Sequence, residues 1–115
     1  MKQLSCHVLD TANGKPAAGI AVKLFHLQGS DTADSFSLEC LAEGVTDLDG
    51  RARFSDISLM PQNYTLRFMV SPYCQAQFGL AFFPFIDVNF SVSDERNHHI
   101  PLLLSPFSYS SYRGS

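Results

Sequence analysis

Apolar and polar residues alternate with a period of two along much of this 115-residue chain, a pattern typical of strands that bury one face. The clearest case is the range 85–92, where Ile86, Val88, Phe90 and Val92 fall on one side and polar residues fall on the other. Further strands are predicted over 4–10, 20–27, 38–45, 64–70 and 102–104, and another is predicted to begin at Arg51. We therefore expect seven or eight short strands.

One stretch interrupts this pattern. The range 71–79 lacks alternation and predicts a short helix, with Ser71 as its N-cap, Pro72 at its first position and Gly79 just after its end. Seven to eight short strands with one short helix indicate an all-β fold, an antiparallel β-sandwich. No linker composition divides the chain, so we expect a single domain over residues 1–115.

The end of the chain is unusually apolar. The leucines at 102–104 lie between two prolines, and the residues that follow include Phe107, Tyr109 and Tyr112. Disordered tails are polar and poor in aromatic residues, and chain ends fray unless they are tied down. We therefore expect this terminus to be docked against the sheet.

Composition excludes several classes of protein. The net charge of −3 argues against a nucleic-acid-binding protein, which needs a clustered basic face. No apolar run approaches the ~20 residues that cross a membrane. The first residues contain no apolar core of a secretory signal, which leaves the cytoplasm as the expected location.

The cysteines do not suggest a disulfide framework. Cys6, Cys40 and Cys74 are an odd set, so they cannot all pair within one chain. We interpret them as reduced, half-buried thiols.

Three stretches carry a resemblance to a known family. They are 7–22, which begins HVLD; 46–51, TDLDGR; and 99–115, HIPLLLSPFSYSSYRGS. In these stretches the chain resembles the transthyretin-like 5-hydroxyisourate hydrolases, and the resemblance spans essentially the whole chain in the same order.

The resemblance implies a prealbumin-like β-sandwich and an activity. That activity is hydrolysis of 5-hydroxyisourate, the unstable product of urate oxidation, to 2-oxo-4-hydroxy-4-carboxy-5-ureidoimidazoline. The catalytic residues it implies are His7, Arg51, His99 and Ser115. The substrate-binding residues it implies, which shape the site, are Tyr112, Arg113 and Gly114. It implies no cofactor, a small-molecule substrate, and a homotetramer (a dimer of dimers) with active sites in the channel between dimers.

These residue types suit the opening of a cyclic amide by water. Water must lose a proton as it attacks, and the ring nitrogen must gain one as the C–N bond breaks. Imidazole titrates near neutral pH and suits both proton transfers. Arginine is always charged and forked, so it suits the carbonyl oxygen that gains charge, or an anionic substrate.

Two adjacent histidines leave a choice of register. The family usually has tyrosine at the position of His98, and alignment against Ile100-Pro101 selects His99 as the catalytic residue. Adjacent residues of a strand point to opposite faces, so only one of the two imidazoles can share a site with His7.

Other readings of the same residues are weaker. A zinc site would need three or four converging ligands, and the sequence has no Cys-x-x-Cys or His-x-x-x-His pair. A Ser or Cys nucleophile is disfavoured because no Gly-x-Ser-x-Gly elbow occurs. The remaining alternatives are a transthyretin-type carrier of small, thyroid hormone-like ligands, and a structural sandwich module.

Overall fold

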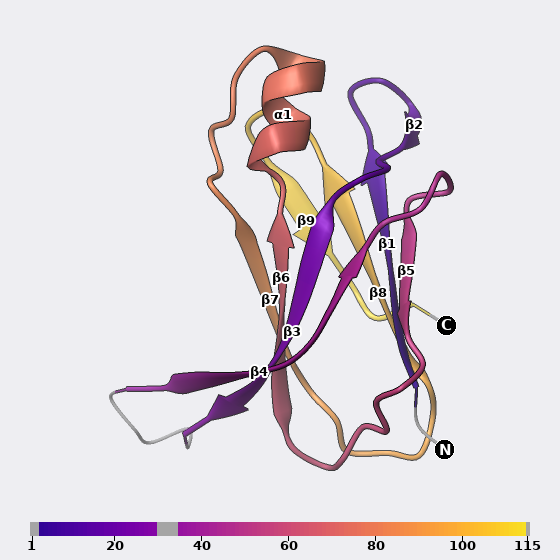
Figure 1. Cartoon of the computed structure of the whole chain (residues 1–115), viewed down its shortest axis with the longest axis vertical. Helices are drawn as coiled ribbons and strands as arrows, with labels where there is room; N and C mark the ends of the chain where they lie inside the picture. The colour runs from indigo at the N-terminus through magenta and orange to yellow at the C-terminus, as the bar shows by residue number, and fades with distance from the viewer. Residues whose placement is uncertain (1–2, 30–34, 115) are drawn as a thin grey trace.

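Two β-sheets pack against each other in the computed structural model, which describes residues 3–29 and 35–114 (Figure 1). The described residues form nine strands and one helix, in the order β1 (Leu4–Asp10), β2 (Lys15–Pro16), β3 (Ala21–Gln28), β4 (Ser37–Val45), β5 (Arg51–Phe54), β6 (Asn63–Met69), α1 (Ser71–Phe78), β7 (Ile86–Ser91), β8 (His98–Leu104) and β9 (Tyr109–Ser111). The predicted β-sandwich with one short helix is confirmed.

Strand β1 is central to the first sheet, whose order is β2-β1-β8-β9. One edge of β1 pairs along its full length with β8. The other edge is shared, because β5 pairs with its first half and β2 with its last two residues. The second sheet has the order β4-β3-β6-β7.

Alternate residues of the strands from both sheets meet in one core. In β1, for example, Leu4, Cys6, Val8 and Asp10 are buried while the residues between them are half-buried. The largest fully buried side chains are Tyr64, Phe68, Leu4, Ile20, Leu24, Leu66, Ile86, Leu102, Leu104, Val8, Val22 and Val70. The period of two therefore divides each strand into a core side and an outer side, and the outer side of the first sheet is available for chemistry.

The expectation of a wholly antiparallel sandwich was wrong at one pair of strands. β1 runs parallel to β8, from Leu4 opposite His98 to Asp10 opposite Leu104. Alternation shows which side chains share a face of a strand, but it carries no information about the direction of a neighbour that lies about ninety residues away.

The short elements also differ in detail from the sequence prediction. β2 and β9 contain two and three residues, too few for alternation to be recognised. The helix begins one residue earlier than predicted, since Val70 is the N-cap and makes no side-chain capping bond. Its end is as predicted, with Gly79 in the left-handed conformation at φ 80°. No helix among the described residues is long and apolar enough to cross a membrane.

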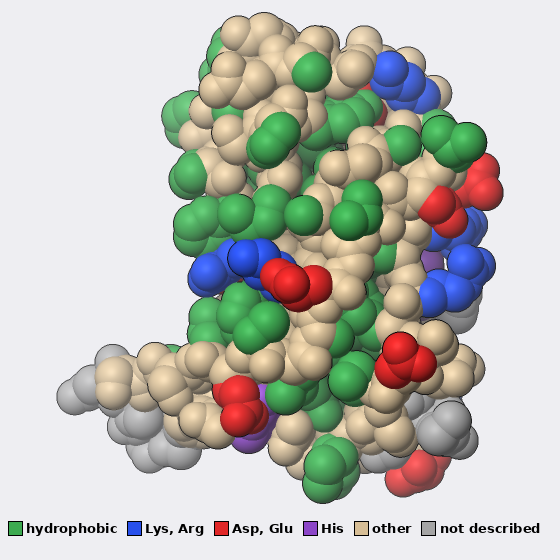
Figure 2. Space-filling model, viewed as in Figure 1, with side chains coloured by type: hydrophobic (Ala, Val, Ile, Leu, Met, Phe, Trp, Pro, Cys, Tyr) green, Lys and Arg blue, Asp and Glu red, His purple; other side chains and the backbone are tan. Residues whose placement is uncertain are grey.

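The chain end is docked, as its aromatic content predicted. β9 pairs with β8, and the Ser111 hydroxyl donates a hydrogen bond to the backbone oxygen of Pro101 at 2.7 Å. Aromatic rings contact each other beside it, with Phe82 5.7 Å from Phe107 and Phe83 5.0 Å from Tyr109 between ring centroids. Figure 2 shows hydrophobic side chains gathered on this side of the molecule, where the chain runs from α1 to β7.

Candidate active site

Three neighbouring strands of the first sheet bring His7, Arg51 and His99 together. His7 on β1 lies directly opposite Arg51 on β5 in the antiparallel register. On the other edge of β1, His99 of β8 lies opposite Ser5, one step along the same face. The two imidazole rings are 6.4 Å apart between centroids and tilted by 41°. All three side chains are half-buried on the outer side of the sheet.

A tight turn sets the position of Arg51 at the start of β5. The Asp47 carboxylate accepts the backbone N–H of Asp49 at 2.9 Å and that of Arg51 at 3.0 Å. These hydrogen bonds hold the pKa of Asp47 below its usual value, and the bond from Arg51 has the largest effect. Gly50 adopts φ +77° there, and a Cβ at this position would stand 2.5 Å from the backbone oxygen of Val8. The TDLDGR stretch therefore folds as a compact turn that delivers Arg51 beside β1.

The ring of His99 is held at two of its edges. The Ser5 hydroxyl lies 2.8 Å from its Nδ1. On the opposite edge, Gly114 lies so close that a Cβ there would stand 2.6 Å from His99 Cδ2. The backbone N–H of Gly114 also donates to the backbone oxygen of His99 at 2.8 Å. The edge that carries Nε2 is left for other partners.

The surroundings of His99 favour its neutral form. Burial lowers its pKa from the usual 6.5, and the electrostatic contributions of its neighbours Arg51, His7 and Arg53 lower it further. An imidazole with a lowered pKa is unprotonated at neutral pH, which is the state that a general base requires.

Replacing Gly114 with alanine is expected to lower kcat by about tenfold, because the new methyl group overlaps His99 Cδ2 and turns the imidazole. Gly44→Ala is the matched control, since a Cβ at Gly44 meets its nearest neighbour at an ordinary 3.6 Å. Steady-state kinetics with a thermal melt for each variant make the comparison. Equal kcat in the two variants would show that the close contact at Gly114 does not matter.

The other residues expected from the chain end have different surroundings. Tyr112 is exposed. The guanidinium of Arg113 forms a two-pronged ion pair with the carboxylate of Asp94, at 3.0 and 3.1 Å. Ser115, expected to be catalytic, lies outside the described residues.

His98 faces the core. Its side chain is 3% exposed, and its ring centroid lies 6.3 Å from that of Phe90 on the second sheet. Its Nδ1–H donates to the backbone oxygen of Arg96 at 3.0 Å. The structure thus brings His99, and not His98, to the same face as His7.

The model of the HIUase/Transthyretin family matches residues 4–114 of this chain. This range includes His7, Arg51 and His99. This chain belongs to the HIUase/Transthyretin family. A 5-hydroxyisourate hydrolase of Caulobacter vibrioides is 43% identical over 122 residues, covering 100% of both proteins. The Klebsiella pneumoniae 5-hydroxyisourate hydrolase structure superposes with a TM-score of 0.79 at 33% identity, covering 100% of both chains.

The family also includes transthyretin. Sea bream transthyretin in complex with thyroxine superposes with a TM-score of 0.81 at 30% identity, covering 96% of this chain and 93% of that one. Hydrolases and transthyretin therefore share this fold, so the fold alone does not separate catalysis from carriage. The side chains on the outer side of the first sheet must do so.

The sequence alone did not indicate three residues that lie near this site. Ser5 contacts His99, Arg53 adds positive charge beside it, and Asp94 holds Arg113. The period of two offered a signal for Ser5 and Arg53, since each lies two residues from a predicted site residue on the same face. Asp94 lies in a connection between strands, where no period applies.

None of the three cysteines lies on the outer side of the first sheet. Cys6 and Cys74 are buried and Cys40 is exposed, and all three are free thiols. Burial raises the pKa of the Cys6 thiol to about 12, although a backbone hydrogen bond from Ala52 opposes this rise. A thiol in this state is a poor nucleophile at neutral pH. Within residues 3–29 and 35–114, no three His, Cys, Asp or Glu side chains are grouped to hold a metal ion.

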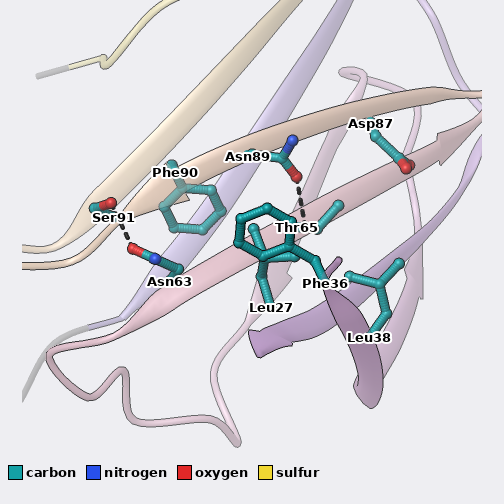
Figure 3. A pocket seen from close by; sticks show the side chains of 9 residues that line it. All are labelled: Leu27, Phe36, Leu38, Asn63, Thr65, Asp87, Asn89, Phe90 and Ser91. Atoms are coloured by element: carbon teal, nitrogen blue, oxygen red, sulfur yellow. Dashed lines mark hydrogen bonds between the residues drawn. The ribbon is translucent and has the colours of Figure 1, made fainter. Parts of the chain in front are cut away.

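A cavity of about 570 Å³ lies on the other sheet (Figure 3). Phe36, Leu27 and Leu38 form its apolar wall. Polar side chains of its other wall hydrogen-bond to each other: Thr65 donates to Asn89 at 2.6 Å, and Ser91 donates to Asn63, as the dashed lines of Figure 3 mark. None of the residues that line this cavity belongs to the histidine site.

Proposed function

We propose that this protein hydrolyses 5-hydroxyisourate to 2-oxo-4-hydroxy-4-carboxy-5-ureidoimidazoline in urate degradation. The observation that carries the proposal is the convergence of His7, Arg51 and His99 on one face of the first sheet. The proposal is supported by the full-length similarity to proteins named 5-hydroxyisourate hydrolase.

In this proposal His99 removes a proton from the attacking water. The base is Nε2, because Ser5 and Gly114 occupy the other two edges of the ring. A basic Nε2 requires the tautomer in which Nδ1–H donates to the Ser5 hydroxyl. The Ser5 hydroxyl can accept this hydrogen bond, and it holds the orientation of the base.

Arg51 and His7 complete the reaction. As water adds to the carbonyl carbon, the carbonyl oxygen becomes negative and Arg51 stabilises it. The C–N bond then breaks, and the leaving nitrogen takes a proton from one of the two imidazoles. At a ring separation of 6.4 Å, a substrate the size of one small heterocycle can contact both histidines. We propose that Tyr112, Arg113 and Gly114 shape the wall of this site.

The assembly belongs to the same proposal. We infer a homotetramer, a dimer of dimers, whose formation would cover the outer side of the first sheet. It is supported by β9 and β7, each of which is an edge strand of its sheet, and by the exposed aromatic residues beside these edges. Unpaired strand edges next to apolar surface favour association.

The test is the ultraviolet absorbance of freshly made 5-hydroxyisourate with and without the purified protein. We expect loss of the absorbance band well above the spontaneous rate, without added metal and in the presence of a chelator. Sedimentation of the same preparation reports the assembly. Decay at the buffer rate would exclude the hydrolase, and saturable binding of a thyroid hormone-like ligand by an inactive protein would identify a carrier.

The pH dependence of kcat/KM follows from the lowered pKa of His99. The neutral imidazole is the active form, so we expect kcat/KM to be constant at neutral pH and to fall as pH drops below about 6.5. Because the charge of Arg51 contributes to the lowered pKa, Arg51→Gln should move this fall to higher pH. An acid limb centred above 6.5 in the unmodified protein would contradict the assignment of His99 as base.

A further inference from the structure

Asp94, in the connection between β7 and β8, gathers donors from two arginines. Arg113 reaches it with both terminal nitrogens, at 3.0 and 3.1 Å. The backbone N–H of Arg96 donates to it at 3.0 Å, and the Arg96 side chain at 3.3 and 3.4 Å. These contacts, with that of Arg113 the largest, hold the pKa of Asp94 far below its usual range. The carboxylate is therefore ionised at neutral pH.

The ion pair is placed where the chain end leaves its strand. β9 ends at Ser111, and the next backbone contact with β8 is the bridge between Gly114 and His99. Tyr112, in this gap, is 57% exposed. Arg113 is thus anchored to Asp94 at the residue directly before Gly114.

The position of Gly114 decides the orientation of the base. Its α-carbon closes the Cδ2 edge of the His99 ring, while Ser5 holds the Nδ1 edge. If Gly114 moved away, only the Ser5 contact would hold the ring, and the direction of Nε2 would be less closely fixed. Small displacements of a catalytic group cost large factors in rate.

We propose that Asp94 is a positioning residue of the active site: by holding Arg113 it keeps Gly114 against His99 and so fixes the direction of Nε2. The proposal rests on the proposed function in one respect, the role of His99 as the base. Asp94 itself does not touch the substrate. It acts through two contacts, first with Arg113 and then between Gly114 and His99.

The size of the effect follows from the exposure of the pair. The two side chains are 38% and 36% exposed, so solvent screens their attraction. The two-pronged geometry makes the pair stronger and more directional than a single contact would be. We expect Asp94→Ala to lower kcat by about fivefold, the upper range for a partly exposed pair, with little change in KM.

The experiment is a double-mutant cycle on Asp94→Ala and Arg113→Ala. If the two act through each other, the double variant should have the same kcat as Arg113→Ala alone. Asp94→Glu, which keeps the charge, should recover part of the loss. Glu43→Ala is the matched control, because it removes an exposed ion pair with Lys23 on the second sheet and should leave kcat unchanged. Additive losses in the cycle would overturn the proposal.

A second measurement does not depend on activity. The ring resonances of His99, followed by NMR against pH, report its tautomer and its pKa. Asp94→Ala should shift these resonances while those of His26 on the second sheet stay constant. Unchanged His99 resonances would overturn the positioning role, whether or not the protein turns over 5-hydroxyisourate. An unmodified protein that fails to turn it over would instead overturn the proposed function.

Discussion

Replacing His99 with asparagine is expected to lower kcat by about a hundredfold or more, the usual scale for losing a positioned acid or base. Asparagine can still hydrogen-bond to Ser5, and it is small enough to fit beside Gly114. It cannot take a proton from water near pH 7, so the loss reports proton transfer and not packing. KM should change little, because the substitution removes proton transfer and leaves the rest of the site in place.

Stopped-flow or steady-state absorbance kinetics measure the effect. Variants of two other histidines provide the comparison. His26→Asn removes an imidazole from β3 in the second sheet and should leave the rate unchanged. His98→Tyr, which introduces the residue usual in the family, should also be nearly silent because His98 faces the core. A large loss at His98 with a normal rate in His99→Asn would reverse the register of the site.

Arg51→Gln is expected to lower kcat by about a hundredfold to a thousandfold, the range for removing a donor to a developing oxyanion. Arg51→Lys should fall between this variant and the unmodified protein, because lysine keeps the charge but loses the fork. Asp47 continues to hold the turn through backbone N–H groups, so the fold should be unaffected by either change.

Arg53→Gln separates a specific role of Arg51 from its charge. Arg53 lies two residues along β5 and also adds positive charge near His99. Its removal should change the rate severalfold at most, through the electrostatic field alone. Losses of equal size in Arg53→Gln and Arg51→Gln would show that Arg51 supplies only general positive charge.

Most of the strands could be predicted because their side chains record which face is buried. The alternation over 64–70 and 85–92 corresponds closely to β6 and β7, and Pro72 with Gly79 marked the helix. Partnership between strands could not be read in this way. Whether β1 lies beside β8, and in which direction, depends on how the two sheets pack, which no local pattern contains.

The candidate site shows the same division. The positions of His7, Arg51 and His99 were predicted by motif, and their shared face is what alternation leads one to expect. The contact between Ser5 and His99 joins residues 94 positions apart, and that between Asp94 and Arg113 joins a connection to a chain end. Such contacts exist only after the sheet has formed. The sequence therefore contains the residues but does not show which of them contact each other.

The central place of β1 has a consequence for biosynthesis. Among the described strands β1 is made before all others, while β8, its partner along the whole of one edge, is made only after β2 to β7. β1 can pair early with β2 and β5, but the first sheet remains incomplete until β8 and β9 have been translated. His7 therefore meets His99 only after β8 has been made, and a chain that stops before β8 lacks His99 and leaves one edge of β1 unpaired.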